Sequence, residues 1–210
     1  QHFDLLKKVV ESGHAEHISL HYNTNGSIRP DETIFNMWQE FKSCEVMFSI
    51  DGIFKKFEYM RHPAKWDEVW SNYNHFKSQD WMHVQVCHTV SLYNVYYLDE
   101  FIDLFGRENI YLNLLHFPKQ YCIRNMPDLC KTQVEEKLIN IPDMNDIISF
   151  MNQEAQYDKL DLGFLPVTER LDGIRNESYS ETFSEFYRIL IDGGIGREPW
   201  NPKQYFGKIS

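Results

Sequence analysis

The stretch HISLHYNTNG (residues 17–26) decides the fold, together with its counterpart CEVMFSIDG (residues 44–52). In both, polar and apolar residues alternate. The polar positions of the first stretch are His17, Ser19, His21 and Asn23. Such alternation is typical of a β-strand with one buried face and one polar face. Each stretch ends in a short polar turn that contains glycine, and α/β proteins place binding and catalytic groups at such turns.

Two further alternating stretches follow, and helical patterns separate all four. We expect strands at about 16–23, 44–50, 82–92 and 109–117. Because helices connect them in βαβ units, the strands should be parallel. Parallel strands covered on both faces are usually apolar throughout, so here one face should meet helices and the other a polar space. The predicted fold class is α/β: a partial (β/α) barrel with parallel strands, incomplete at its N-terminal side. A closed eight-stranded barrel would need an apolar interior.

The pattern changes after residue 126. Residues 1–126 should form the partial barrel, and residues 127–210 a mostly helical C-terminal extension with segments near 127–140, 144–152 and 180–191. The chain opens inside an amphipathic helix that ends at Gly13, with no cap or strand before it. We therefore expect the sequence to be part of a longer protein.

Composition narrows the range of partners. The 210 residues are 42% hydrophobic and carry a formal net charge of -10. This charge, without a dense Lys/Arg cluster, argues against nucleic acid and against anionic membranes, so a peptide or small-molecule partner is expected. The four cysteines form no CxxC pair, which favours a reducing, cytoplasmic location. No stretch reads as a signal peptide or a membrane span.

Ser49, Asp51 and Arg61 are the first candidate binding group. By the alternation, Ser49 and Asp51 point toward the polar space, and Arg61 ends the next short helix. A hydroxyl, a carboxylate and a guanidinium together suit a zwitterionic ligand or one that carries a ribose. The structural alternative is an aspartate in a turn and a surface arginine paired with a neighbouring carboxylate.

The turn after the first strand supplies two more candidates. Asn23 lies on the polar face, within reach of a ligand. Asn25 is followed by Gly26, and the alternative for this pair is a simple turn with left-handed backbone.

A metal site made by protein groups alone is not expected. His17 and His21 lie about 13 Å apart along one strand, and His83 and Cys87 fail as a pair for the same reason. No GxSxG, HExxH or Walker motif occurs.

The order of motifs resembles a known family. ISLHYNTNGS, VMFSIDGIFKKFEYMR, VCHTVSLYN and YLNLLHFP, with helices between them, are similar to the core of radical S-adenosylmethionine (radical SAM) enzymes over about residues 1–120. The resemblance is to the twitch or SPASM-like branch, which modifies peptides and occurs in bacteria and phages.

This resemblance implies a partial (β/α)6 barrel that holds S-adenosylmethionine against a 4Fe-4S cluster. It implies that Ser49 and Arg61 bind the ribose or the methionyl carboxylate, and that Asp51 is a catalytic residue beside the reacting centre. The other implied cofactor-binding positions are Asn23, Asn25, Val90 and Leu115, the last two through backbone beside the adenine.

The chain departs from the family in one respect. The CxxxCxxC loop and the Gly-Gly-Glu-Pro segment should both precede Phe3, and the sequence contains neither. Without three cysteinyl thiolates there is no cluster to reduce the sulfonium. The complete enzyme should therefore use S-adenosylmethionine and a 4Fe-4S cluster, whereas this fragment should be inactive alone, with no cofactor bound.

The expected function of the complete form is reductive cleavage of S-adenosylmethionine to a 5'-deoxyadenosyl radical, which abstracts hydrogen from a peptide or small substrate. The alternative is a non-catalytic binding or assembly module built on a degenerate barrel. A metal-independent lyase or isomerase would need a Lys or Glu at the C-terminal end of a strand. An exposed sheet edge would also favour a homo-oligomer.

Overall fold

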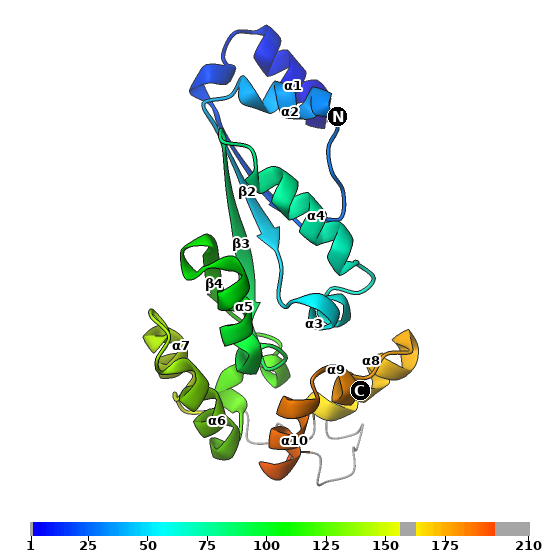
Figure 1. The fold of residues 1–210 in the computed structure, drawn as a ribbon, viewed down its shortest axis with the longest axis vertical. Coiled ribbons are helices and arrows are strands. Elements are labelled where there is room, and N and C mark those ends of the chain that lie inside the picture. The colour runs from blue at the N-terminus through cyan, green and yellow to red at the C-terminus, as the bar shows by residue number, and fades with distance from the viewer. Residues whose placement is uncertain (1, 156–162, 196–210) are drawn as a thin grey trace, which may run out of the picture. The chain divides into compact units, whose positions relative to one another are not determined.

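The computed structural model describes residues 2–155 and 163–195 (Figure 1). It is an α/β fold with a four-stranded parallel sheet in the order β1-β2-β3-β4. The strands are β1 (Ser19–Thr24), β2 (Ser43–Ser49), β3 (Met82–Val90) and β4 (Ile110–Leu114). The predictions of an α/β fold and of parallel strands are confirmed. His17 lies outside β1, because a short 3-10 helix precedes this strand.

Helical segments connect and follow the strands. The α-helices are α1 (His2–Glu11), α2 (Glu32–Gln39), α3 (Phe54–Met60), α4 (Trp66–Lys77), α5 (Leu98–Phe105), α6 (Asp128–Leu138), α7 (Asn145–Met151), α8 (Phe164–Arg175), α9 (Tyr179–Thr182) and α10 (Ser184–Asp192). Short 3-10 helices lie at Ala15–His17, Val95–Tyr97, Arg107–Asn109, Lys119–Tyr121 and Ile123–Asn125. No helix in the described ranges is long and apolar enough to cross a membrane.

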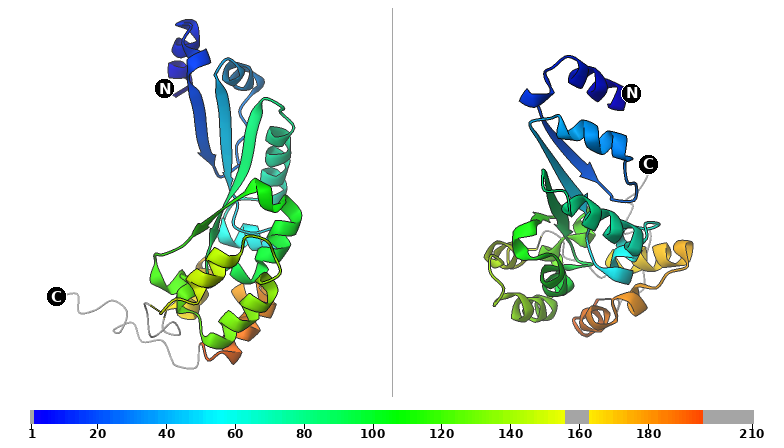
Figure 2. Two further views of the ribbon diagram at one scale, coloured as in Figure 1. Left: turned by 90° about the vertical axis from the view of Figure 1, so that its left-hand side faces the viewer. Right: turned by 45° about the horizontal axis from the view of Figure 1, so that its top comes forward.

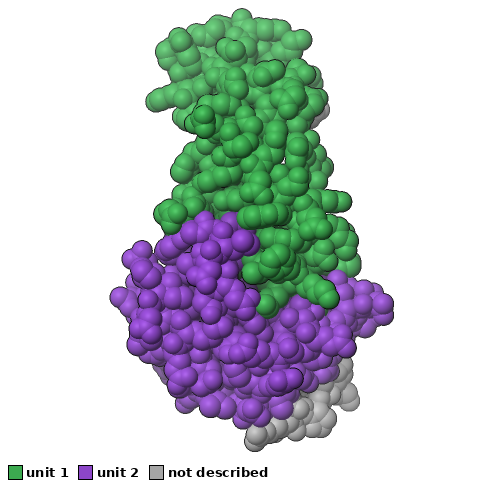
Figure 3. Space-filling model, viewed as in Figure 1, with its two compact units in different colours: residues 1–88, 108–111 green, residues 89–107, 112–210 purple. Residues whose placement is uncertain are grey.

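The chain divides into two compact units (Figure 3). Unit 1 comprises residues 1–88 and 108–111, and unit 2 comprises residues 89–107 and 112–210. The sequence predicts a boundary after residue 126, between a partial barrel and a helical extension. The two compact units divide at other positions, and the division into barrel and extension stays a prediction.

In unit 1 the sheet has one apolar face and one polar face. Val46, Phe48 and Ile50 are at most 1% exposed. Glu45 and Met47, which alternate with Val46 and Phe48, are only partly buried. The two-sided strands predicted from the alternation are therefore confirmed in this unit.

Helices α2 and α4 cover the apolar face of these strands (Figures 1 and 2). Phe76 of α4 meets Phe35 of α2 edge to face, with ring centroids 5.0 Å apart, and meets Phe48 of β2 in the same way at 5.2 Å. Tyr22 of β1 stacks on Trp38 of α2 at 4.8 Å. Because aromatic contacts fill this side, the opposite face of the sheet is left for polar groups.

Unit 2 is mostly helical and has its own aromatic core. Tyr93 packs between Tyr121 and Phe164, with centroids at 5.2 and 5.0 Å, and its hydroxyl bonds to Thr168 Oγ1 at 2.8 Å. Phe164 and Thr168 belong to α8, which lies between the helical segments expected near 144–152 and 180–191. Pro166 in its first turn and Gly173 in its interior weaken the helical pattern.

Candidate functional site

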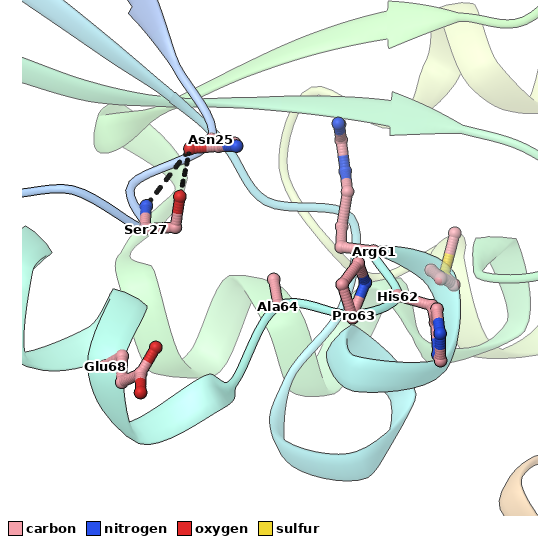
Figure 4. Close-up of a pocket in the computed structure, with 8 residues that line it drawn as sticks. Asn25, Ser27, Arg61, His62, Pro63, Ala64 and Glu68 are labelled. Carbon is pink, nitrogen blue, oxygen red and sulfur yellow. Dashed lines mark hydrogen bonds between the residues drawn. The ribbon is translucent and has the colours of Figure 1, made fainter.

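The carboxyl ends of β1 and β2 are level, since Thr24 pairs with Phe48 in the sheet register. The chain leaves β1 through the turn of Asn25 and Ser27. Oδ1 of Asn25 accepts hydrogen bonds from Ser27 N (3.1 Å) and Ser27 Oγ (2.8 Å), and its amide nitrogen points away from Ser27 (Figure 4). The turn is thus held by the side chain of Asn25 itself.

Gly26 is required at the centre of this turn for two reasons. Its φ of +74° is a conformation that other residues rarely adopt. A Cβ at this position would also lie 2.8 Å from the ring of Phe48. The turn after β1 therefore packs directly on the core, which fixes its place beside β2.

Asp51 and Arg61 meet at the end of β2. Nη2 of Arg61 lies 2.6 Å from Oδ2 of Asp51, and the two side chains are 31% and 11% exposed. Nε of Arg61 is buried and makes no hydrogen bond within the described part of the chain. The guanidinium is therefore only partly satisfied by protein groups.

A pocket of about 510 Å³ lies at this edge of unit 1 (Figure 4). It is bordered by the turn after β1, the turn after α3 and the first turn of α4. Its lining residues are Asn25, Ser27, Met60, Arg61, His62, Pro63, Ala64 and Glu68. Hydrogen-bond donors, one carboxylate and apolar side chains therefore surround a space the size of a small-molecule site.

The structure places the predicted residues at different distances from this pocket. Asn25 and Arg61 line it, and Asp51 joins it through the ion pair with Arg61. Ser49 lies on the polar face of β2, opposite Cys87 of β3. Asn23 is exposed on β1 and borders a separate cavity of about 230 Å³.

Val90 and Leu115 belong to unit 2. The backbone N–H of Leu115 donates to the carbonyl of Val90 at 3.1 Å, so the two residues are neighbours. Their implied role beside an adenine stays a prediction.

Two titratable groups of β3 lie close to the Asp51–Arg61 pair. Nδ1 of His88 is 3.2 Å from the carbonyl oxygen of Ile50, and burial lowers the pKa of His88 to about 4, although the Asp51 charge opposes this shift. Burial also raises the pKa of the Cys87 thiol, which Asp51 raises further and Arg61 lowers. A neutral imidazole and a protonated thiol therefore stand beside the ion pair.

Ser27, His62 and Glu68 line the pocket but are missing from the candidates drawn from the sequence. Ser27 follows the Asn25-Gly26 turn and His62 follows Arg61. Their position next to candidate residues in the sequence could therefore have identified them as pocket residues. Glu68 lies in the first turn of α4. Its place beside the pocket depends on how α4 packs on the sheet, which the local sequence does not encode.

No known protein family matches the chain, and neither a curated protein nor a solved structure does. The resemblance to radical SAM enzymes therefore rests on the quoted motifs alone. Its consequences for function are a proposal.

Proposed function

We propose that the chain is the cofactor-binding and substrate-facing part of a radical SAM enzyme, with its strands belonging to a partial (β/α) barrel. The observation that carries this proposal is the pocket at the carboxyl edge of β1 and β2, which Asn25 and Arg61 both line and where Asp51 pairs with Arg61. Open parallel sheets bind ligands at this edge.

The pocket suits the polar part of S-adenosylmethionine. The ligand carries a carboxylate, an ammonium and a ribose, and Arg61 offers a guanidinium whose buried Nε makes no bond within the described residues. Asp51 and Glu68 supply carboxylates for an ammonium or hydroxyl groups. In radical SAM enzymes this cofactor supplies a 5'-deoxyadenosyl radical. The residues of this chain would bind and orient it and keep it near the polar sheet face.

The cysteines present do not fit a 4Fe-4S cluster. Cys44, Cys122 and Cys130 are buried and far apart in sequence, and Cys87 is only partly exposed. Burial raises the pKa values of Cys44 and Cys130 to about 12, which disfavours the thiolates that bind iron. The four cysteines of this chain therefore do not supply the ligands of such a cluster.

Ligand titration tests the proposal. S-adenosylmethionine is not expected to stay bound to this fragment, because no cluster holds its methionyl group, but it should show weak, rapidly exchanging binding in calorimetry or ligand-observed NMR at millimolar concentration. Arg61→Ala should weaken this binding about tenfold or more, since a charge-assisted hydrogen bond is lost.

Lys7→Ala is the matched control, because it removes one positive charge from the exposed side of α1. It should leave binding unchanged. Equal affinity of Arg61→Ala and the wild-type chain would remove Arg61 from the site, and no binding at millimolar ligand would refute the proposal.

A binding or assembly module is the second candidate, and the edge of β1 favours it. Strand β1 ends the sheet. Exposed apolar side chains in α1 and on either side of β1 in the sequence include Phe3 (44% exposed), Leu5 (59%), Ile18 (39%) and Ile28 (78%). Unpaired strand edges with apolar surroundings promote association.

Size-exclusion chromatography with light scattering over a concentration series tests this second candidate. A monomer–dimer equilibrium that Ile28→Ser weakens would support assembly through the β1 edge. A strictly monomeric chain at every concentration would count against it.

A further inference from the structure

His21, Glu45 and His83 form a row across three neighbouring strands. The sheet register pairs His21 of β1 with Glu45 of β2, and Glu45 with His83 of β3. All three side chains are partly open to solvent, at 50%, 37% and 63% exposed. They lie on the polar face of unit 1, the side that α2 and α4 do not cover.

The imidazoles flank the two oxygens of one carboxylate. Nδ1 of His21 is 2.8 Å from Oε2 of Glu45, and Nε2 of His83 is 3.8 Å from Oε1. Ligands about 2.0–2.1 Å from a tetrahedral zinc ion lie roughly 3.3 Å from one another. The two observed nitrogen–oxygen separations bracket that value, so each imidazole lies at about ligand spacing from the carboxylate. Binding one shared ion would require the two imidazoles to rotate toward each other over Glu45.

The three side chains do not surround a metal position in this structure, and no three His, Cys, Asp or Glu side chains of the described residues do. An added ion would replace the hydrogen bond between His21 and Glu45. It would bind Nδ1 of His21 in the tautomer that carries its proton on Nε2, and Nε2 of His83 in the opposite tautomer. Neutral imidazoles and an ionised carboxylate are ligands that zinc accepts.

We propose that His21, Glu45 and His83 bind a divalent transition metal of the zinc type, with solvent completing the coordination. Along a single strand His17 and His21 would be too far apart to share an ion, whereas strand pairing places His21, Glu45 and His83 side by side.

The proposal is independent of the cofactor pocket. Glu45 and Asp51 are six residues apart along β2 and the turn after it, about 20 Å in extended backbone. Loss of metal binding and loss of S-adenosylmethionine binding would therefore be separate results.

Zinc titration by calorimetry and the visible absorption of bound cobalt(II) test the site in the full chain. A Cys87→Ser background removes the least buried thiol. We expect one ion per chain and a tetrahedral cobalt spectrum. His21→Gln, Glu45→Gln and His83→Gln should each weaken binding about tenfold or more.

His17→Gln is the control, because His17 is exposed nearby but outside the row. It should leave the affinity unchanged, and all four variants should keep the circular dichroism of the parent. No saturable zinc binding, or equal weakening by His17→Gln, would overturn the proposal.

Discussion

Asp51 and Arg61 link the end of β2 to the end of α3, with Oδ2 and Nη2 2.6 Å apart. Asp51 lies in the connection between β2 and α3, and Arg61 lies in the turn after α3, so the ion pair joins two segments beside the pocket. Asp51 is largely buried, whereas Arg61 is about one-third exposed, so solvent screens part of the attraction.

A double-mutant cycle with Asp51→Asn and Arg61→Gln should show a coupling free energy of about 1 kcal/mol in urea unfolding. The Lys65–Glu58 pair, at 3.7 Å and with Lys65 64% exposed, should couple less. Additive effects of the two pocket substitutions would contradict a stabilising ion pair.

Cys87 should be the first thiol to react with a disulfide reagent in the folded chain, because the other three cysteines are buried. Asp51→Asn should speed the reaction, since Asp51 raises the pKa of Cys87. Arg61→Gln should slow it, since Arg61 lowers that pKa. Stopped-flow labelling measures the rates, and Cys87→Ser should abolish the fast phase. Rate changes in the same direction for both charge variants would contradict the predicted electrostatics.

Stability should fall as the pH decreases from about 6.5 toward 4. Burial lowers the folded-state pKa of His88 to about 4, so the unfolded chain takes up a proton in this range while the folded chain does not. The loss is on the order of 3 kcal/mol for this group. Urea unfolding across this pH range should give a flatter profile for His88→Gln. The exposed His14→Gln should keep the wild-type slope, and an unchanged slope in His88→Gln would refute the assignment.

Gly26→Ala should destabilise the chain more than Gly13→Ala. Both glycines have φ of +74°, but a Cβ at Gly13 meets nothing within 4 Å, whereas at Gly26 it meets Phe48 at 2.8 Å. We expect about 1 kcal/mol for Gly13→Ala, and an additional 1–3 kcal/mol or so at Gly26 from the clash. Thermal unfolding of the two variants measures the difference in stability that the clash with Phe48 causes. Equal destabilisation by the two substitutions would show that Phe48 moves aside without cost.

The sequence alone predicts the strands because alternation reports directly on which side is covered. Val46, Phe48 and Ile50 are buried as their parity requires, and His88 shares the buried parity of Val84 and Val86. The bounds are less predictable. Strand β4 ends at Leu114 rather than near residue 117, and α8 carries Pro166 and Gly173, which obscure its periodicity.

The candidate site is predictable only in part, because a pocket depends on register and on helix packing. Arg61 can be found from its place after a short helix, but its contact with Asp51 needs the turn geometry. The row of His21, Glu45 and His83 needs the pairing of three strands, which no single stretch encodes. Local sequence patterns therefore predict the helices and strands, whereas the residues of a site come together only through non-local strand pairing and helix packing.

The division of the sheet into a covered side and an open side also separates two kinds of evolutionary constraint. Substitutions at Glu45, Met47 or Ser49 change the chemistry of the open side without disturbing the aromatic packing under α2 and α4. A one-residue slip of β2 would exchange the two sets of side chains and expose Phe48. The open side can thus change position by position, whereas an insertion that shifts the register of β2 would disturb both sides at once.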